Sequence, residues 1–505
     1  MAERSHREPA VRPTPLADVV RRLKRAGLLV DGVSAPVTVR GVSDDSRSVA
    51  PGDLFCAWAG TDTDSHAYVG TAAEAGAVAA LVERKVAAAV PQVVVSDGRR
   101  AAAVAASHLL DDPAQGKQLV AVTGTNGKTT TVWILRHLLG GRAATASVGT
   151  LGVHLPDGST AENRSSVTTP GPVELVGALR AAADAGAQVV VLEASSHALD
   201  QGRLGALTFN VAVFTSFSRD HLDYHGTEAA YLAAKLSLAD ALKADGALVL
   251  NAQEPAWRGL TDRAAGRVLA FAVENGTVTP ETARSQVRAR RVRLGVSGAE
   301  FELVTPFGGA SVRLPLLGRH NVQNALAAVA AGLSLDFDVS ELAERLATVP
   351  QVPGRLELVA ERPCPVLTDY AHTPDALQRV LEAVRPLVSG RLIVVFGAGG
   401  DRDRGKRPQM GEVAARLADV PVVTSDNPRT EDPESIIDDV VAGMPGLPVR
   451  ITDRRSAIRH ALEMARPDDM VLLAGKGHET YQVVGTERRP FDERVVVREL
   501  TEGAA

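Results

Sequence analysis

Short apolar runs alternate with amphipathic stretches along most of the chain, and this alternation predicts an α/β protein. In the first part it predicts helices over residues 72–83 and 99–110 and a strand over residues 92–96. We assign these elements to a small α/β domain at residues 16–115. Residues 1–15 are polar and contain no apolar run, so we expect a disordered tail there and no signal peptide.

From residue 118 the pattern changes to a strand (LVAVTG), a glycine loop (TNGKT) and a helix (TVWILRHLL). Further apolar runs alternate with helical segments, at residues 189–192, 211–214 and 247–250. This order is typical of a parallel sheet buried between two layers of helices. We therefore expect a central doubly wound domain at residues 116–348, which includes a helix over residues 321–333.

A segment rich in proline and glycine, TVPQVPGRLE, precedes a new series of strands and helices. Its predicted elements are a helix over residues 374–387 and strands over residues 365–369, 392–396 and 470–474. They indicate a Rossmann-like third domain at residues 349–505. A chain of 505 residues also exceeds what one hydrophobic core supports, so several domains are expected.

Composition limits the class of partner. Hydrophobic residues make up 45% and charged residues 23%, as in ordinary globular proteins. The net charge of -5 offers no general attraction to nucleic acid or to an anionic membrane, so we expect neither partner. Cys56 and Cys364 are the only cysteines and form no CxxC spacing, which fits a reducing cytoplasm. We expect a monomer with small-molecule partners.

The glycine loop carries the strongest chemical signal. Backbone amides, the start of a helix and Lys128 can surround phosphate oxygens here, and the Thr129 hydroxyl can bind Mg²⁺. The general P-loop pattern requires a glycine where this chain has Val122. The loop still predicts that ATP is a co-substrate and Mg²⁺ a cofactor, with ATP contacts from Gly124, Thr125, Asn126, Gly127, Lys128, Thr129 and Thr130.

Two polar residues follow apolar strands in the central domain. Glu193 ends the run VVVLE, where a carboxylate at the carboxyl end of a strand can hold a metal, although a solvated strand end would look the same. His221 lies in SRDHLDYHG just past the strand VAVF, and a lone histidine is more often structural.

Lys235 stands out because lysine is scarce: the chain has eight lysines and 47 arginines. It lies among apolar neighbours in the helical segment AAYLAAKLSLAD. A buried lysine can lose its proton and react with carbon dioxide to form a carbamate, which a guanidinium cannot do. The alternative is a lysine that extends from the helix face to water.

Over nearly its whole length the chain resembles the Mur ligases of cell-wall synthesis, through TGTNGKT, SRDHLDYHG, DNPR and GKGHE. The resemblance implies that Lys128, Glu193, His221 and Lys235 are catalytic. It also implies that Lys235 carries a carbamate (N6-carboxylysine) and that the metal ligands are Thr129, Glu193, His221 and this carbamate.

Further ligand contacts follow from the same resemblance. Besides the loop, it implies ATP contacts by His320, Asn321, Asn324, Arg355, Asp369 and His372, although asparagine also caps helices without any ligand. It implies contacts to UDP-N-acetylmuramoyl-L-alanyl-D-glutamate by Ser46, Thr168, Thr169, Ser195, Gln201 and Arg203. For Ser195 the alternative is again a helix cap.

The third domain is expected to hold the incoming amino acid. The family positions are Arg402, Asp426, Asn427, Pro428, Arg429, Gly475 and Glu479. DNPR resembles the branch that adds meso-2,6-diaminopimelate, whose second carboxylate Arg429 can pair with at two points and whose second ammonium Glu479 can meet. A proline turn with a surface arginine is the alternative. The glycines of FGAGGDRD lack GxGxxG spacing, so we expect no dinucleotide.

The expected reaction is transfer of the γ-phosphoryl group of ATP to the D-glutamate side-chain carboxylate, followed by attack of an amine on the acyl phosphate. Alternatives within the superfamily are a lysine-adding ligase and a folylpolyglutamate synthase, against which DNPR and GKGHE argue. A P-loop switch or motor would leave the motifs of the third domain unexplained. Intact Lys128, Glu193, His221 and Lys235 argue against a regulator without activity.

Overall fold

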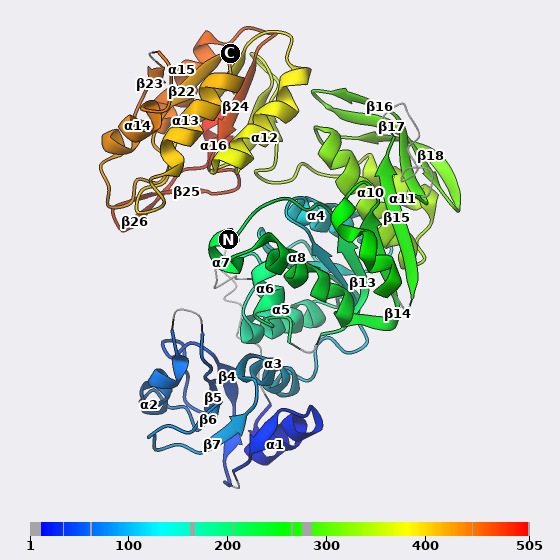
Figure 1. Ribbon diagram of the computed structural model, residues 1–505, viewed down its shortest axis with the longest axis vertical. Helices are drawn as coiled ribbons and strands as arrows, with labels where there is room; N and C mark the ends of the chain where they lie inside the picture. Colours follow the sequence, from blue (N-terminus) through cyan, green and yellow to red (C-terminus); the bar gives the residue numbers. More distant parts are fainter. Residues whose placement is uncertain are drawn as a thin grey trace.

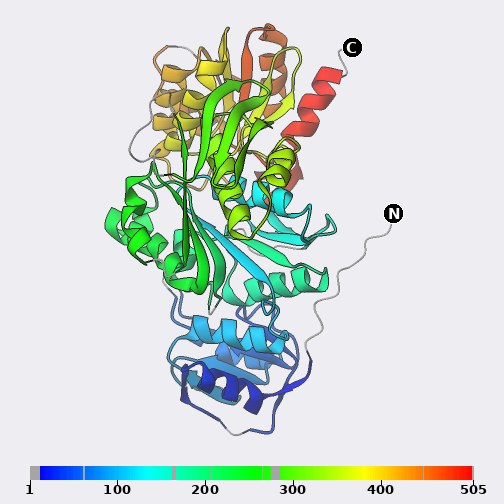
Figure 2. The ribbon, with the colours of Figure 1, turned by 90° about the vertical axis from the view of Figure 1, so that its right-hand side faces the viewer.

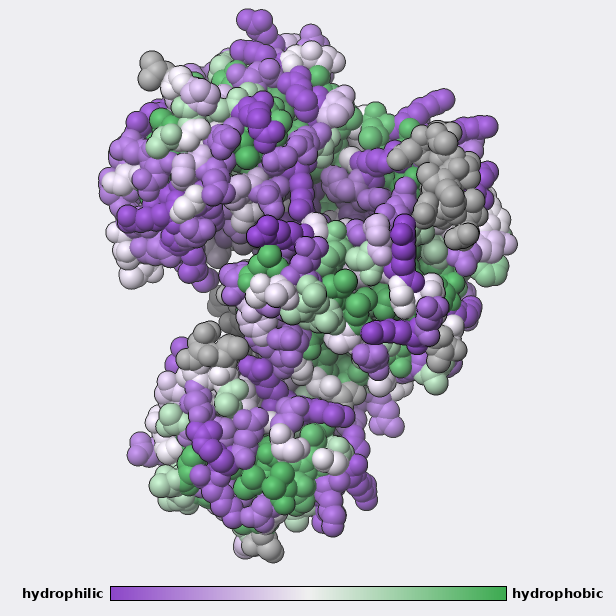
Figure 3. All heavy atoms as spheres, viewed as in Figure 1, coloured by the Kyte–Doolittle hydropathy of each residue, from purple (hydrophilic) through white to green (hydrophobic). Residues whose placement is uncertain are grey.

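The computed structural model describes residues 12–33, 35–60, 63–161, 167–205, 207–263, 266–274, 285–446 and 448–502. Three regions follow one another along the longest axis, each built around its own sheet (Figure 1 and Figure 2). In the space-filling view the surface is hollowed on one side of the central region, between the two outer regions (Figure 3). No helix among the described residues is both long enough and apolar enough to cross a membrane.

The N-terminal region has a five-stranded sheet in the order β2-β7-β6-β5-β4. Its elements are β1 (Thr14–Pro15), α1 (Leu16–Arg25), β2 (Leu29–Asp31), β3 (Thr38–Val39), β4 (Gly41–Ser43), β5 (Asp53–Cys56), α2 (Val69–Glu74), β6 (Ala79–Val82), β7 (Gln92–Val95) and α3 (Gly98–Leu109). Helix α3 and the Leu110 that follows it pack against α5 (Pro172–Asp184) of the central region, where Ala106 and Leu110 contact Val176. This contact joins the two regions.

Two expectations for this region need correction. The predicted helix over residues 72–83 is wrong in its second half: α2 ends at Glu74, Gly76 adopts a φ of +109°, and β6 begins at Ala79. All four residues of β6 are buried between β5 and β7, and an alanine-rich run has no periodicity that separates a buried strand from a helix. The tail predicted over residues 1–15 is wrong for Thr14–Pro15, because these two residues pair with β3. Residues 1–11 lie outside the described part of the chain.

The central region has an eleven-stranded sheet in the order β11-β10-β9-β12-β8-β13-β14-β15-β16-β17-β18. Its strands are β8 (Gln118–Thr123), β9 (Thr145–Gly149), β10 (Gly152–His154), β11 (Thr160–Ala161), β12 (Val189–Glu193), β13 (Phe209–Phe214), β14 (Leu242–Asn251), β15 (Arg267–Val273), β16 (Val287–Gly295), β17 (Gly298–Thr305) and β18 (Gly308–Leu314). Strands β9, β12, β8, β13, β14, β15 and β16 run parallel. The doubly wound arrangement is confirmed.

Helices cover both faces of this sheet. Alternate residues of β8 belong to different cores: Val120 and Val122 pack with the helices on one face, and Leu119 and Ala121 with those on the other. The helices of the region are α4 (Lys128–Leu139), α5 (Pro172–Asp184), α6 (Ser196–Asp200), α7 (Leu222–His225), α8 (Glu228–Leu236), α10 (Arg319–Ser334) and α11 (Val339–Leu346). Strand β8 lies between β12 and β13, so the loops after these three strands meet at one edge of the sheet.

The C-terminal region has a six-stranded sheet in the order β19-β20-β24-β21-β22-β23, parallel except for β19. Its elements are β19 (Glu357–Ala360), β20 (Val366–Asp369), α12 (Pro374–Val384), β21 (Leu392–Phe396), α13 (Lys406–Leu417), β22 (Val420–Val423), α14 (Pro433–Val441), β23 (Val449–Arg450), α15 (Arg454–Met464), β24 (Met470–Ala474), β25 (Tyr481–Val484), β26 (Glu487–Pro490) and α16 (Glu493–Glu502). The loops after β20, β24, β21 and β22 meet at the carboxyl edge of this sheet.

Candidate active site

The glycine loop connects β8 to α4, as the sequence predicts. Gly124 and Gly127 adopt φ values of +145° and +87°, where side chains are strained. A methyl group on Gly124 would lie 2.0 Å from the hydroxyl oxygen of Thr215, and one on Gly127 would lie 2.4 Å from Oδ1 of Asn324. Both positions therefore require glycine, and the loop presents its backbone at the start of a helix.

Hydrogen bonds from neighbouring segments hold the other residues of the glycine loop. Thr125 Oγ1 accepts hydrogen bonds from the Tyr231 hydroxyl (3.0 Å) and from the backbone nitrogen of Ser218 (3.0 Å). The carbonyl oxygen of Asn126, whose side chain is exposed, accepts a hydrogen bond from Thr215 Oγ1 (2.6 Å). Thr130 is buried on α4. The loop is thus anchored on the segment after β13.

Two lysines meet at this loop. Lys128 Nζ donates hydrogen bonds to the carbonyl oxygens of Gly124 and Thr125, each at 2.9 Å, and Lys235 Nζ donates to the same Gly124 oxygen at 2.8 Å. Lys235, on α8, is 1% exposed and lies over the Tyr231 ring at 4.4 Å. Burial and the nearby Lys128 charge lower the pKa of Lys235 to about 6. Its amine is therefore largely neutral at pH 7, the state that reacts with carbon dioxide.

Glu193 ends β12 next to the glycine loop. Its Oε2 accepts hydrogen bonds from Thr129 Oγ1 (2.9 Å) and Thr150 Oγ1 (3.2 Å), and its Oε1 accepts one from the Thr150 backbone nitrogen (2.8 Å). The side chain is buried, and this burial raises its pKa while the Lys128 charge opposes the rise. A buried carboxylate beside a hydroxyl is an oxygen donor set that suits Mg²⁺.

His221 stands apart from Glu193. It has a φ of 50° and directly precedes α7, and its side chain is about half exposed. Its ring lies 4.8 Å from that of His197 and 6.1 Å from that of Tyr231, the residue that also faces Lys235. In the described part of the chain, no cluster of three or more His, Cys, Asp or Glu side chains could hold a metal. The structure therefore brings Thr129 to Glu193 and Lys235 to Lys128, but it does not join His221 to either pair.

The loop after Glu193 brings several predicted substrate residues together. Thr169 Oγ1 donates to the Glu193 carbonyl oxygen (2.7 Å) and lies 3.2 Å from Ser195 Oγ. Arg203 donates from Nη1 to the Thr169 carbonyl oxygen (3.0 Å) and from Nε to Gln201 Oε1 (2.9 Å). Ser195 also caps α6, because its hydroxyl accepts a hydrogen bond from Ala198, so the capping alternative is correct for this contact. Four polar side chains thus converge beside Glu193.

The loop that contains Ser46 lies against the start of α5 through its neighbour Asp44. Ser46 is half-buried in a loop whose Asp45 and Arg47 form an ion pair at 2.7 Å. The neighbouring Asp44 lies against the start of α5, where a methyl group on Gly171 would be 3.4 Å from its Oδ2. Burial raises the pKa of Asp44 to about 6. Thr168 accepts a hydrogen bond from Thr150 Oγ1 at 3.3 Å, and Thr150 is itself bonded to Glu193.

The asparagines at the start of α10 pack behind the glycine loop. Asn324 Nδ2 donates to Asn321 Oδ1 (3.0 Å), and Asn321 Nδ2 donates to the Leu317 carbonyl oxygen (2.8 Å). Both side chains are buried, and Oδ1 of Asn324 lies against Gly127. His320 beside them is exposed. The two asparagines therefore support the loop from behind, and His320 alone of the three faces solvent.

The predicted ATP residues of the C-terminal region lie around the end of β20. Asp369 accepts backbone hydrogen bonds from Leu356 (2.8 Å) and Ala371 (2.9 Å), and its burial raises its pKa. The Arg355 guanidinium lies over the Tyr370 ring at 5.2 Å, and its buried Nε has no hydrogen-bond partner among the described residues. His372 accepts a hydrogen bond from Lys406 through its carbonyl oxygen (2.9 Å).

The C-terminal and central regions touch near this point. Arg379 Nη2, on α12, donates to Ser218 Oγ at 3.1 Å, and the backbone of Ser218 is bonded to Thr125 of the glycine loop. A cavity of about 370 Å³ lies beside this contact and is lined by residues of both regions. The contact therefore places α12 beside the segment that anchors the glycine loop.

The predicted amino acid residues meet at the carboxyl edge of that sheet. Asn427 Nδ2, after β22, donates to Glu479 Oε2 at 2.9 Å. Gly475, after β24, has a φ of +120°, and a methyl group there would lie 2.5 Å from Oδ2 of Asp426. This oxygen is buried and has no hydrogen-bond partner among the described residues. Pro428, which follows Asn427 and precedes Arg429 in the chain, is buried.

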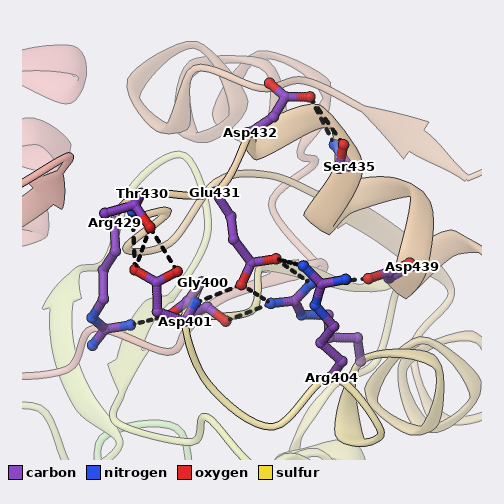
Figure 4. A network of polar contacts seen from close by, with 11 residues as sticks. Gly400, Asp401, Arg404, Arg429, Thr430, Glu431, Asp432, Ser435 and Asp439 are labelled. Atoms are coloured by element: carbon purple, nitrogen blue, oxygen red, sulfur yellow. Dashed lines mark hydrogen bonds and ion pairs between the residues drawn. The ribbon is translucent and has the colours of Figure 1, made fainter.

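Arg429 has a φ of 52° and donates from Nη1 to the Gly400 carbonyl oxygen at 2.7 Å. Figure 4 shows the network that fixes this loop: Thr430 bonds both carboxylate oxygens of Asp401 at 2.9 Å, and Glu431 pairs with Arg404 at 2.8 Å. A methyl group on Gly399 would lie 3.0 Å from Arg429 Nη1 and 3.9 Å from Arg402 Cγ. The structure thus places both predicted arginines beside one glycine.

Two residues that contact the predicted site were not anticipated. Thr150 lies in the turn between β9 and β10, and nothing in its local sequence marks it. Lys476 is fully buried and bonded to both Asn427 (3.1 Å) and Glu479 (3.0 Å). Its signal was present, because it is one of only eight lysines and lies inside the GKGHE motif.

Known families account for this architecture. Residues 122–332 match the model of the Mur ligase middle domain, and residues 354–477 match that of the Mur ligase, glutamate ligase domain. The chain belongs to the Mur ligase family. Among curated proteins it is 44% identical to the UDP-N-acetylmuramoyl-L-alanyl-D-glutamate--2,6-diaminopimelate ligase of Gloeobacter violaceus, over 94% of this chain and 96% of that protein. It is also 44% identical to the protein of the same name from Synechococcus elongatus, over 92% and 94% of the two chains.

Solved structures agree on the fold. A structure titled as the same 2,6-diaminopimelate ligase matches with a TM-score of 0.69 and 33% identity, over 98% of this chain and 99% of that one. A folylpolyglutamate synthase of Mycobacterium tuberculosis, complexed with ADP and AMPPCP, matches with a TM-score of 0.59 and 22% identity, over 74% and 91% of the two chains. At that identity the second likeness concerns the fold alone.

Proposed function

We propose that this protein adds meso-2,6-diaminopimelate to the D-glutamate side-chain carboxylate of UDP-N-acetylmuramoyl-L-alanyl-D-glutamate, with ATP as co-substrate. The observation that carries this proposal is the pair of opposite charges at one edge of the C-terminal sheet, Arg429 after β22 and Glu479 after β24. Such a pair suits a far end that bears both a carboxylate and an ammonium group. The names of the curated relatives agree with this substrate.

ATP binds at the glycine loop in this proposal. The backbone amides at the start of α4 and the Lys128 ammonium hold the phosphates, since the amino end of a helix attracts anions. His320 and the Arg355 guanidinium approach the nucleotide from the two regions, while Asn321 and Asn324 hold the loop in place. Asp369 and His372 lie at the end of β20 and shape the same space.

Magnesium supplies positive charge that offsets the phosphate oxygens during transfer. Thr129 and Glu193 would hold one ion, and Lys235 as its carbamate would give with Glu193 a second metal position. His221 is the further ligand that the family resemblance implies. The carbamate forms when the neutral amine of Lys235 attacks carbon dioxide and releases a proton, and this converts a cation into an oxygen donor. The uncommonly low pKa of this buried lysine supports that conversion.

The UDP-linked substrate lies between the first and second regions, with Ser46 on one side and Thr168, Thr169, Ser195, Gln201 and Arg203 on the other. The γ-phosphoryl group passes to its carboxylate, and the amine of diaminopimelate then displaces phosphate from the acyl phosphate. Closure of the C-terminal region over the glycine loop brings the amine near and excludes water. We assign the domains to residues 16–115, 116–348 and 349–505, and the protein to the cytoplasm as a monomer.

Phosphate release by the purified protein tests this function. The reaction contains ATP, Mg²⁺ and UDP-N-acetylmuramoyl-L-alanyl-D-glutamate, together with meso-diaminopimelate, L-lysine or no amino acid. We expect release only with diaminopimelate, accompanied by the tripeptide product. Equal release with lysine would favour the lysine-adding ligase, and release without any amino acid would favour a switch or motor.

A further inference from the structure

Lys476 occupies an unusual position for a lysine. Its side chain is fully buried in the first turn after β24, and its Nζ lies within 3.1 Å of Asn427 Oδ1 and 3.0 Å of Glu479 Oε2. The Tyr481 ring lies 6.0 Å from the same nitrogen. Burial of an ammonium group is costly unless its charge is neutralised and its protons are bonded. Glu479 supplies the opposite charge, and the two acceptors bond two of the three ammonium protons, so the position favours a cation.

The three side chains form a closed set of hydrogen bonds. Asn427 donates to the same Glu479 oxygen at 2.9 Å, and its own Oδ1 accepts a further bond from the Val483 backbone nitrogen at 2.9 Å. Lys476 and Asn427 therefore hold Glu479 through one oxygen only. The other oxygen, Oε1, accepts no hydrogen bond from any described residue. Glu479 is half-buried and keeps this oxygen available to a ligand.

An arginine at position 476 could not make the same hydrogen bonds as Lys476. It is the common cation of this chain, but its planar guanidinium donates in a fixed fork, whereas an ammonium donates along three rotatable directions. The acceptors Asn427 Oδ1 and Glu479 Oε2 come from two different loops and converge on one nitrogen. A single compact donor fits this convergence.

We propose that Lys476 is a positioning residue for the second amine of the incoming amino acid. It touches no substrate atom and acts by orienting Glu479, so that Oε1 faces the ammonium group at the far end of diaminopimelate. This inference rests on the proposed function. Lys476 would then be the fourth residue that recognises the far end of diaminopimelate, besides Arg429, Asn427 and Glu479.

A purely structural role makes a different prediction. If Lys476 only holds the loop after β24 to the β25 hairpin, its loss weakens every amino acid substrate equally. If it orients Glu479, its loss weakens only substrates with a far-end amine. The analogue 2-aminopimelate keeps the far carboxylate and lacks the far amine, so it separates the two roles.

The test compares Lys476→Met, Glu479→Gln and the double variant with the wild type, using diaminopimelate and 2-aminopimelate. For Lys476→Met we expect kcat/KM for diaminopimelate to fall about 10- to 100-fold, the factor of one charge-assisted hydrogen bond. The value for 2-aminopimelate, or its inhibition constant if it does not turn over, should change less than about threefold, as should KM for ATP. The double variant should be no worse than Glu479→Gln, because both changes remove one interaction.

Lys243→Met is the matched control, since Lys243 also bonds an asparagine oxygen (Asn210 Oδ1, 3.0 Å) but lies at the start of β14 in the central sheet. It should leave the preference for diaminopimelate unchanged. Equal losses on both amino acids, or additive losses in the double variant, would overturn the positioning role. If Lys476→Met does not fold, the double variant is compared with Glu479→Gln instead, because the double variant leaves no unpaired charge. A wild type without diaminopimelate-dependent product would instead overturn the proposed function.

Discussion

Lys128 and Lys235 share one acceptor, the carbonyl oxygen of Gly124, which their Nζ atoms approach to 2.9 and 2.8 Å. Burial of Lys235, and after it the nearby Lys128 charge, disfavour the ammonium form of Lys235 and lower its pKa to about 6. The Gly124 carbonyl oxygen thus links the lysine proposed to bind phosphate with the lysine proposed to carry a carbamate. Both proposed roles depend on this arrangement.

The unmodified Lys235 should destabilise the fold in a way that depends on pH. Its folded pKa of about 6 lies below the usual 10.5, so between these values the unfolded chain binds more protons and stability rises with pH. Lys235→Met should therefore raise the melting temperature most near pH 6, and its advantage should shrink toward pH 10. Thermal unfolding of both proteins in buffers free of carbon dioxide measures this. A difference that does not vary with pH would contradict the low pKa.

Carbamylation of Lys235 can be observed directly. With ¹³C-labelled bicarbonate above pH 7 we expect a carbamate carbon signal in the NMR spectrum of the wild type, because the neutral amine is the reactive form. Lys235→Arg should lack the signal and lose at least about 100-fold in kcat, since a guanidinium cannot form the carbamate. Full activity in Lys235→Arg would remove the carbamate from the mechanism.

A methyl group in the glycine loop should block the nucleotide. Gly127→Ala places its Cβ 2.4 Å from Asn324 Oδ1 at a φ of +87°, so the loop has to move. We expect affinity for an ATP analogue to fall at least about tenfold by calorimetry, with the circular dichroism spectrum retained. Gly177→Ala is the matched control, because nothing lies within 4 Å of its added methyl inside α5. It should bind normally and gain up to about 1 kcal/mol of stability.

Arg429 should determine the choice of amino acid. Arg429→Lys keeps the charge but loses the planar fork that pairs with a carboxylate at two points. KM for diaminopimelate should rise about 10- to 100-fold, while KM for ATP stays within about twofold, as measured by phosphate release. An unchanged KM for diaminopimelate would mean that its far carboxylate lies elsewhere.

The C-terminal sheet is held by a buried ion pair that can be tested for stability. Arg454 and Glu493 lie 2.7 Å apart with both side chains fully buried, and Thr368 donates a further hydrogen bond to Glu493 at 2.7 Å. Glu493→Ala leaves the arginine charge unpaired and should cost about 3–5 kcal/mol of unfolding free energy. The exposed pair between Arg455 and Glu499, also 2.7 Å apart, is the comparison. Glu499→Ala should cost less than about 1 kcal/mol in the same denaturant titration.

Much of the backbone followed from the sequence alone. Continuous apolar runs bounded by glycine or polar residues were confirmed residue by residue at β21 and β24, and the strand, loop and helix around Lys128 lie where the pattern predicts. In such segments the local preference and the tertiary environment agree. Residues 72–83 were an exception, because an alanine-rich run suits a helix and a buried strand alike. Pairing with β5 and β7 made its second half the strand β6.

The site divides in the same way. Sequence alone was enough to propose the residues whose chemistry is local, such as Lys128 in its loop or Arg429 in DNPR. Only the tertiary structure decided which side chains meet. Thr150 reaches Glu193 across 43 residues and Thr131 reaches Asn324 across 193, because the strand order places those loops together. A local pattern determines backbone conformation, whereas the partners of a buried charge depend on which elements become neighbours, and no window of sequence contains that information.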